Sequence, residues 1–314
     1  MLYIGIDLGG TGIKAGVVDE KGKILGKATC PTEPERGYGA VIQDMAALAY
    51  KAVEKSGHTI DEIKSIGIGL PGVLDPRTGR VPFCTNLRWH DVPVIEEMHK
   101  YTDLPVYVDN DATVAGLAES VAGVSAGMQN SVFITLGTGV GGGVVLGGKV
   151  FSGSHGVASE IGHMITVVDG EQCTCGNRGC WERYASATAL IREGRRMCGD
   201  NPDTELYKAV NGDITAITAK HVIDLAKAGD PDCSRLFDRY VYHLCVGLAN
   251  LINVYDPEII VLGGGVSHAG EFLLTAVNAK LPGMVFYKDM PFARVALAKL
   301  TNDAGIIGAA MLGR

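Results

Sequence analysis

A pattern of strand, glycine-rich turn and strand occurs twice in this chain, and this repetition constrains the fold more than any other feature. The first copy is YIGIDLGGTGIKAGVVD, residues 3–19, and the second is SVFITLGTGVGGGVVLGGKV, residues 131–150. After each copy comes an acidic lead-in, an apolar strand and a glycine-rich loop, as DEIKSIGIGLPG and then DPEIIVLGGGVS. The repetition predicts an internal duplication: two similar α/β domains face each other across a cleft, and each points a glycine turn inward.

The bulk composition is that of an ordinary globular protein. The 314 residues are 46% hydrophobic, and a chain of this length favours two domains over one. The formal net charge of -7 argues against nucleic acid as the main partner. We expect no membrane partner and a cytoplasmic location, because Met1 leads into a strand-like run and the apolar stretches are broken by glycine.

A metal site is predicted in the stretch from Glu160 to Glu182. Three of the eight cysteines lie in it with the spacing C-x-C-x4-C, at Cys173, Cys175 and Cys180, and His163 precedes them. Three thiolates and an imidazole form a closed tetrahedral set, as in structural zinc sites. The alternative, buried thiols that act as small hydrophobic groups, fits poorly with a segment this polar and rich in glycine.

Two carboxylates flank the predicted metal site. Glu160 and His163 stand at i and i+3, on one face if the segment is helical, and Glu182 follows the last cysteine by two residues. Such groups, held in place by a metal, are suited to a ligand rich in hydroxyls. Taken alone, they are equally well explained as solvated surface glutamates.

The first glycine turn is a candidate phosphate cradle. DLGGT matches neither the Walker pattern nor the dinucleotide-binding pattern, yet a hairpin turn with free N–H groups can hold a phosphate. Asp7 at its entry is placed to hold Mg²⁺, and Lys14 can supply a cation. The turn by itself is also compatible with a tight hairpin that has no ligand.

A polar corner, Asp109-Asn110-Asp111, follows a predicted buried strand, at the strand end where α/β folds place ligands. Asp111 is equally well explained as the N-cap of a helix that begins near Thr113. The two neighbouring aspartates can raise the pKa of one of them. Upstream, residues 78–93 have no clear pattern and are predicted to be irregular, with Trp89 free to contact a polar ligand.

Helices are predicted where apolar residues recur at helical spacing. The clearest examples are residues 40–56, residues 94–101 and most of residues 184–250. The chain ends in NDAGIIGAAML, a helix of small residues suited to close packing, which we expect to return to the first domain.

Together these motifs resemble the ROK family of sugar kinases in the actin-like ATPase superfamily. The resemblance covers DLGGT with Lys14, LPG, DND, LGTGVGGG, E-x-x-G-H, C-x-C-G-x2-G-C-x-E and LGGG, and is most specific in the zinc motif. Among the branches of the family, the sequence is most similar to the bacterial glucokinases. The resemblance implies a duplicated, ribonuclease H-like α/β fold around a central cleft. Its smaller domain spans residues 1–112 plus about 302–314, and its larger domain spans residues 113–301 with the zinc site inserted.

The resemblance also implies a site and a reaction. Asp111 is the base that accepts the proton of the sugar 6-hydroxyl while that oxygen attacks ATP, and Mg²⁺ neutralises charge on the phosphates. His163 both ligates structural Zn²⁺ and contacts the sugar. The sugar is bound by Gly72, Asn86, Asn110, Asp111, Glu160, His163 and Glu182. The nucleotide and its metal are bound by Asp7, Gly9, Gly10, Thr11, Lys14, Gly137, Thr138, Gly139, Gly264 and Gly265.

Three other readings remain open at this point. The protein could be a kinase for another hexose or an N-acetylhexosamine, because the same residues can bind several sugars. It could instead be a sugar-sensing regulator without catalysis, although Asp111 and the acidic charge speak against this. A purely structural zinc module would leave both glycine turns unexplained. The assembly that we expect is a homodimer.

Overall fold

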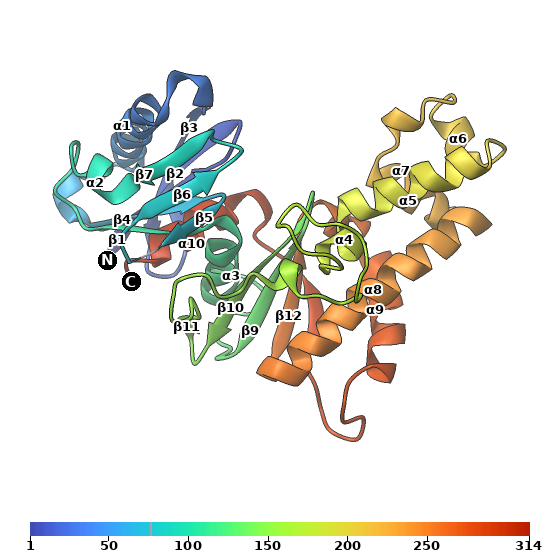
Figure 1. The fold of residues 1–314 in the computed structure, drawn as a ribbon. Coiled ribbons are helices and arrows are strands. Elements are labelled where there is room, and N and C mark those ends of the chain that lie inside the picture. The colour runs from blue at the N-terminus through green and yellow to red at the C-terminus, as the bar shows by residue number, and fades with distance from the viewer. Residues whose placement is uncertain (76) are drawn as a thin grey trace. The chain divides into compact units, whose positions relative to one another are not determined.

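The computed structural model describes residues 1–75 and 77–314, and the chain forms two compact units (Figure 1). The first unit comprises residues 1–133, 143–159 and 299–314, and the second comprises residues 134–142 and 160–298. Among the described residues, no helix is both long and apolar enough to span a membrane. These compact units do not test the predicted domain boundaries at residues 112 and 302, which stay predictions.

The first unit is built on a five-stranded sheet with the order β3-β2-β1-β4-β8. Strands β1 to β3 are antiparallel, whereas β4 and β8 run parallel to β1. The elements are β1 (Leu2–Leu8), β2 (Gly12–Asp19), β3 (Ile24–Pro31), α1 (Tyr38–Ser56), β4 (Ile63–Leu70), β5 (Val73–Asp75), β6 (Arg80–Cys84), β7 (Trp89–Pro93), α2 (Val94–Met98), β8 (Val106–Asn110), α3 (Asp111–Ala122) and α10 (Ala304–Met311).

A second five-stranded sheet has the order β11-β10-β9-β12-β13. It matches the first sheet position by position: a hairpin with a third strand on one side, then two later strands on the other. The predicted duplication is therefore confirmed. The strands are β9 (Ser131–Leu136), β10 (Val140–Leu146), β11 (Lys149–Val150), β12 (Ile259–Gly263) and β13 (Arg294–Leu297).

Helices dominate the second unit between its glycine turn and β12, as the apolar spacing predicts. The longest of them, α8, begins after the Asp230 cap, whose side chain accepts a hydrogen bond from the Cys233 amide, and has proline at its first position. The helices are α4 (Glu182–Ala185), α5 (Ala187–Asp200), α6 (Glu205–Ala209), α7 (Ala219–Lys227), α8 (Pro231–Tyr255) and α9 (Glu271–Lys280).

The prediction of an irregular segment at residues 78–93 is wrong. Strands β5, β6 and β7 form a small antiparallel sheet of their own, with Val81 paired to Val92 and Cys84 paired to Trp89. Trp89 is 2% exposed and belongs to the core, so it is not available to a ligand. The alternation was hard to recognise because the strands are short and contain charged residues and proline.

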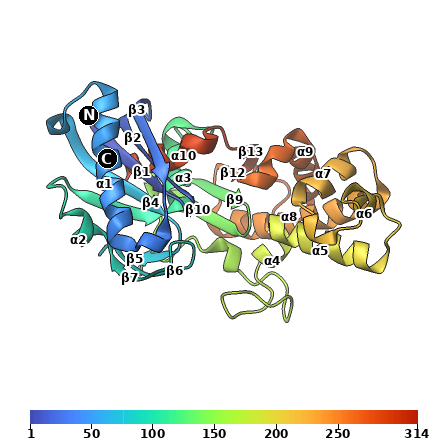
Figure 2. The same ribbon diagram turned by 90° about the horizontal axis from the view of Figure 1, so that it is seen from above.

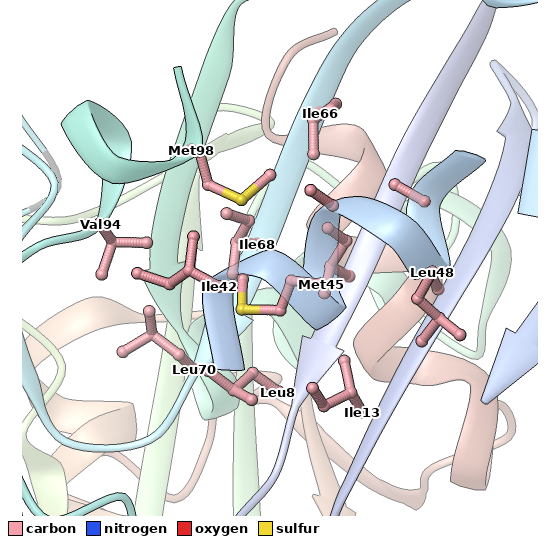
Figure 3. Close-up of a cluster of buried hydrophobic side chains, with 14 of the residues drawn as sticks. Leu8, Ile13, Ile42, Met45, Leu48, Ile66, Ile68, Leu70, Val94 and Met98 are labelled. Carbon is pink, nitrogen blue, oxygen red and sulfur yellow. The ribbon is translucent and has the colours of Figure 1, made fainter. Parts of the chain in front are cut away.

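The core of the first unit lies between its sheet and the helices α1 and α2. Figure 3 shows Ile42 and Met45 of α1 beside Ile68 of β4, with Met98 of α2 directed toward the same strand. All four side chains are essentially fully buried. This apolar layer fixes the end of β4, from which the LPG loop emerges.

Helix α10 packs against the sheet of the first unit at backbone distance (Figure 1). A methyl group added at Gly5 would lie 1.9 Å from the carbonyl oxygen of Ile306, and one added at Gly67 would lie 1.7 Å from that of Ala309. The terminal helix therefore lies against the backbone of β1 and β4. Glycine in two neighbouring strands is what lets the helix approach so closely.

We predict that Gly67→Ala destabilises the protein by about 3 kcal/mol, because its methyl group meets backbone that cannot move aside cheaply. Gly39→Ala in α1 is the matched control, since a methyl group there meets nothing within 4 Å. The control should raise the free energy of unfolding by about 0.5–1 kcal/mol. Urea unfolding of both variants checks the prediction, and a neutral Gly67→Ala would contradict it.

Candidate active site

The first glycine turn joins β1 to β2 and is closed by its own backbone. The Gly9 amide donates to the Gly12 carbonyl at 2.9 Å, and the Thr32 hydroxyl donates to the Gly9 carbonyl at 2.6 Å. Within residues 1–75 and 77–314, no protein atom accepts a hydrogen bond from the backbone amides of Gly10 and Thr11. Two adjacent donors at a tight turn form a small anion-binding concavity.

Asp7 and Lys14 are cross-strand partners at the base of this turn. The Lys14 ammonium lies 3.0 Å from Asp7 Oδ2. A methyl group at Gly305, in the first turn of α10, would lie 2.4 Å from the Asp7 carboxyl carbon. The carboxylate therefore sits at a helix N-terminus, where the macrodipole favours negative charge. The pair provides one anionic group for a hydrated cation and one cation for a phosphate.

The polar corner after β8 contacts the LPG loop. The Asn110 side-chain amide donates to the Gly72 carbonyl at 3.2 Å, and its oxygen accepts from the Ala112 amide at 2.9 Å. Gly72 has φ of 99°, where a side chain would be strained. Asn86 lies against the first glycine turn, with its Cβ 3.4 Å from a methyl group placed on Gly10. Within the first unit, the polar corner therefore contacts the LPG loop, and Asn86 contacts the first glycine turn.

Asn110, rather than Asp111, is the N-cap of α3, so the capping explanation of Asp111 is wrong. Asp111 is the first residue of the helix and is exposed, and its Oδ1 accepts from the Ala112 amide at 2.8 Å. Capping by its neighbour leaves the Asp111 carboxylate on the first turn, at the positive end of the helix dipole. That position suits a group that must be an anion before it takes a proton.

Asp109, buried behind the corner, has a displaced pKa. Burial raises the pKa of this carboxyl group to about 6, and the hydrogen bond from the Asn110 amide opposes the shift. Desolvation, and not the charge of the second aspartate, is the cause. Asp109 is 9% exposed, and its buried carboxyl group accepts a hydrogen bond from the Asn110 amide of the corner.

This shift predicts a pH-dependent stability. In the folded state Asp109 keeps its proton up to about pH 6, whereas the usual pKa of an exposed aspartate is 3.8. The folded state therefore binds more protons than the unfolded state between these two values. The free energy of unfolding should therefore fall by about 2–3 kcal/mol as pH rises from about 4 to 6. Asp109→Asn should remove this fall and raise stability at pH 7, whereas Asp103→Asn on the exposed surface should not. Unfolding curves across pH test this, and an unchanged slope in Asp109→Asn would contradict it.

The second unit contains the predicted metal cluster. His163, Cys173, Cys175 and Cys180 each offer one ligand atom, and these atoms lie within 4.8 Å of one another. His163 Nδ1 is 3.8 Å from Cys173 Sγ, and Cys175 Sγ is 3.5 Å from Cys180 Sγ. Metal–ligand bonds of about 2.0–2.3 Å at tetrahedral angles place such atoms about 3.5–3.8 Å apart. The four residues therefore fit a tetrahedral metal ion.

Protonation at this cluster differs from thiol to thiol. Burial raises the pKa of Cys180 to about 12 and also raises that of Cys173, whereas the hydrogen bond from the Asn177 backbone lowers the pKa of Cys175. A metal ion binds thiolates and so displaces the protons of the buried thiols.

Both flanking glutamates contact the cluster's residues. Glu160 Oε2 is 3.9 Å from His163 Nε2, which confirms that they share one face. Glu182 begins α4, and its Oε1 lies 3.2 Å from Cys173 Sγ. A methyl group on Gly139 would lie 2.5 Å from Glu182 Oε2. Glu182 therefore stands between the metal cluster and the second glycine turn.

The second glycine turn is braced in the same way as the first. The Gly137 amide donates to the Gly139 carbonyl at 3.0 Å, and the Thr188 hydroxyl donates to the Thr138 carbonyl at 2.7 Å. Gly264, after β12, has φ of 82°, and a methyl group there would lie 2.6 Å from the Leu136 nitrogen. The late loop thus begins directly beside this turn. A methyl group at Gly265 meets nothing within 4 Å, so the space over that residue is open.

Each unit therefore brings together the predicted residues that belong to it. Sequence reasoning missed Thr32 and Thr188, which brace the turns, and Gly305, which admits the Asp7 carboxylate. No local pattern marks them: Thr32 and Thr188 are 23 and 50 residues away from the carbonyls that they bind, and Gly305 belongs to the last helix.

The fold and the site define a class of protein. A duplicated sheet with the order found here, and a glycine turn at the hairpin of each copy, is the actin-like ATPase fold. The chain belongs to the ROK family, whose sequence model matches residues 3–314.

Similar proteins cover the chain from end to end. The glucokinase of Thermotoga maritima is 38% identical over 310 residues, which span 98% of this chain and 96% of that protein. A ROK family glucokinase from Streptomyces griseus, solved in complex with glucose and AMPPNP, is 36% identical, with a TM-score of 0.81 and 99% of both chains covered. The ROK hexokinase from Thermus thermophilus is 34% identical, with a TM-score of 0.86 and 99% and 97% of the two chains covered.

Proposed function

We propose that this protein transfers the γ-phosphoryl group of ATP to the 6-hydroxyl of glucose. It is an ATP-dependent hexose kinase, since named glucokinases match it over their full length at 36–38% identity. We choose glucose as the substrate because the chain is similar to the Streptomyces griseus enzyme. That enzyme was solved with glucose and AMPPNP, and the similarity covers 99% of both chains.

Asp111 is the general base of this reaction. Its carboxylate takes the proton of the sugar 6-hydroxyl as that oxygen forms a bond to the γ-phosphorus, and the bond from this phosphorus to the bridging oxygen of ADP breaks. Such transfer depends chiefly on positioning and charge. The exposed position of Asp111 on the first turn of α3, beside the cap made by Asn110, supports the assignment.

Sugar-binding residues are assigned in each unit separately. In the first unit, Asn110 binds a hydroxyl with its amide, close to Gly72 and Asn86. In the second unit, Glu160 and Glu182 accept hydrogen bonds from sugar hydroxyls, and His163 donates one. Carboxylates and amides at fixed positions recognise hydroxyls with specificity because a wrong sugar leaves them unpaired. The assigned sugar-binding residues are Gly72, Asn86, Asn110, Asp111, Glu160, His163 and Glu182.

Each glycine turn, taken by itself, is assigned to the phosphates of the nucleotide. Asp7 holds the Mg²⁺ that accompanies ATP, directly or through water, and Lys14 balances the phosphate charge. The open space at Gly265 suits the nucleoside. The assigned nucleotide-binding residues are Gly9, Gly10, Thr11, Lys14, Gly137, Thr138, Gly139, Gly264 and Gly265.

A structural zinc ion is held by His163, Cys173, Cys175 and Cys180, whose spacing fits it. When bound, it supplies fixed geometry to the segment and takes no part in the chemistry. His163 would offer Nδ1, which lies 3.8 Å from Cys173 Sγ, to such an ion, and its Nε2 would then carry the proton of the imidazole. His163 then donates a hydrogen bond from the side that faces Glu160.

A coupled ADP-release assay with ATP, Mg²⁺ and a panel of hexoses and N-acetylhexosamines tests the proposed function. We expect turnover with glucose, with a higher kcat/KM than for fructose, allose or N-acetylmannosamine. Preference for another sugar would keep the kinase and replace the substrate. No turnover with any sugar, in folded protein that contains zinc, would contradict the proposal and leave a sugar-binding regulator.

Gly139→Ala tests the position of Glu182. Its methyl group would lie 2.5 Å from Glu182 Oε2, so the carboxylate must move. We expect KM for glucose to rise about tenfold, the effect of losing roughly one good hydrogen bond. Gly137→Ala, in the same turn but with nothing within 4 Å of its methyl group, is the control for effects on ATP. Equal changes in both variants would contradict the prediction.

A further inference from the structure

A cavity of about 560 Å³ lies in the helical part of the second unit, apart from its glycine turn and metal cluster. Helices α5 and α8 form its walls, and they lie side by side (Figure 2). Four arginines line it in two pairs with helical spacing of four: Arg192 and Arg196 on α5, and Arg235 and Arg239 on α8. None of these residues has a role in the proposed kinase reaction.

Three of the arginines share a single carboxylate. Glu193 Oε1 accepts from Arg192 at 2.9 Å and from Arg196 at 3.1 Å, and Glu193 Oε2 accepts from Arg239 at 2.8 Å. Glu193 is only 19% exposed, so these pairs are partly shielded from water. Asp200 and Asp232 also line the cavity, and Asp232 pairs with Arg235. The four arginines of the lining therefore exceed its three carboxylates by one charge, before the pair of Arg196 with Glu171 is counted.

The hydrogen-bond donors also exceed the acceptors. Each guanidinium carries five N–H groups, whereas one carboxylate has about four lone-pair positions. The charged ends of Arg196 and Arg239 remain accessible, with side-chain exposures of 52% and 63%. Guanidinium groups bind phosphate oxygens in pairs, which makes such a surplus suited to a phosphate group.

Apolar side chains form the rest of the lining. Leu190 and Met197 of α5 and Leu236 of α8 line it, and Tyr184 adds an aromatic ring tilted against that of His243, with the ring centroids 4.9 Å apart. A ligand with both a carbon body and an anionic group would use the whole cavity. We propose that this cavity binds a small organic phosphate at Arg196 and Arg239, at a site separate from the one that binds sugar and ATP.

The cavity contacts the segment that carries the metal cluster. Arg196 pairs with Glu171 at 2.9 Å, and the Glu171 amide donates to the Tyr184 hydroxyl at 2.7 Å. An anion at Arg196 competes with Glu171 for the guanidinium and so loosens the start of the metal-binding segment. If the proposed function holds, occupancy of the cavity therefore weakens glucose binding through the residues that follow, including Glu182.

Calorimetric titration of the zinc-loaded protein with phenyl phosphate tests the site without any assay of catalysis. We expect binding, weaker binding of inorganic phosphate, and none of phenol. The double variant Arg196→Gln/Arg239→Gln should lose at least about tenfold in affinity for phenyl phosphate. The matched control Lys208→Gln/Lys220→Gln removes the same charge from exposed lysines of α6 and α7 and should retain the affinity.

Three outcomes would overturn the proposal. Absence of binding by the wild type would remove the site. Equal affinity in the Arg196→Gln/Arg239→Gln variant would show that the phosphate binds elsewhere, such as on the glycine turns. A change of oligomeric state in that variant, with unchanged phosphate affinity, would identify the arginines as a subunit interface. Thermal unfolding and zinc content establish that each variant is folded.

The proposed coupling between the cavity and glucose binding is measured separately, as a change in KM for glucose. Saturating phenyl phosphate should raise this KM severalfold in the wild type and the lysine control, and leave it unchanged in the double arginine variant. If phenyl phosphate binds by calorimetry and KM does not move, the coupling is wrong. If no sugar is phosphorylated at all, the proposed function fails while the calorimetric result stands.

Discussion

Asp111→Asn should lower kcat for glucose phosphorylation by about 10³-fold and change KM for glucose by less than about threefold. Asparagine keeps the shape of the side chain and its hydrogen bond with the Ala112 amide, but it cannot take a proton. The substitution therefore raises the free energy of the transition state, in which the 6-hydroxyl proton is being transferred, and leaves glucose binding nearly unchanged. Steady-state kinetics with ATP held saturating separates the two parameters.

The matched control for this change is Asp109→Asn, two residues away in the same corner. Asp109 is buried and serves the fold, so its loss should lower kcat far less than the loss of Asp111. Retention of at least a tenth of wild-type kcat by Asp111→Asn, with an inactive Asp109→Asn, would move the base to Asp109. Circular dichroism and unfolding curves show whether both variants keep α3.

Cys180→Ala should remove bound zinc and lower the free energy of unfolding by at least about 3 kcal/mol, because a structural zinc site contributes directly to folding. Cys180 is fully buried and shares the cluster with Cys175 at 3.5 Å. We also expect KM for glucose to rise more than about tenfold, since His163 and Glu182 lose the support that orients them. Metal analysis, thermal unfolding and kinetics measure the three effects.

Cys30→Ser serves as the control for the loss of a thiol. Cys30 lies on β3, in the first unit, and takes no part in the cluster. The Cys30→Ser variant should retain its bound zinc and the wild-type KM for glucose, and its free energy of unfolding should stay within about 1 kcal/mol of the wild-type value. If Cys180→Ala keeps its zinc, or loses zinc without any change in KM, the role assigned to the metal segment in sugar binding would be wrong.

The duplication and the metal ligands could be predicted from the sequence because their signals are local. Each glycine turn is flanked by β-branched strands, and the cysteine spacing places three thiols on a short, polar loop. The sheets β3-β2-β1-β4-β8 and β11-β10-β9-β12-β13 confirm the duplication, and the four candidate ligand atoms lie within 4.8 Å of one another. The small sheet of β5 to β7 could not be recognised, because its strands are too short to show a period.

The assignment of roles within the corner after β8 required the structure. Asp109, Asn110 and Asp111 have adjacent positions and similar chemistry, so the sequence left the cap and the displaced pKa undecided. Burial selects Asp109 as the carboxyl group with the raised pKa, and the helix start selects Asn110 as the cap. The burial of Asp109 depends on neighbours that are distant in sequence, and the cap, a contact between Asn110 and Ala112, depends on where the helix begins.

The sequence by itself determined the duplicated α/β fold, the glycine turns, the candidate cluster of one histidine and three cysteines, and the family. These features depend on backbone freedom, strand periodicity and ligand spacing, which are properties of short segments. Only the tertiary structure placed Glu182 against Gly139, Gly305 against Asp7, and three arginines around Glu193. Such contacts join residues from separate elements, and which elements meet is decided by the packing of the whole core and not by any local pattern.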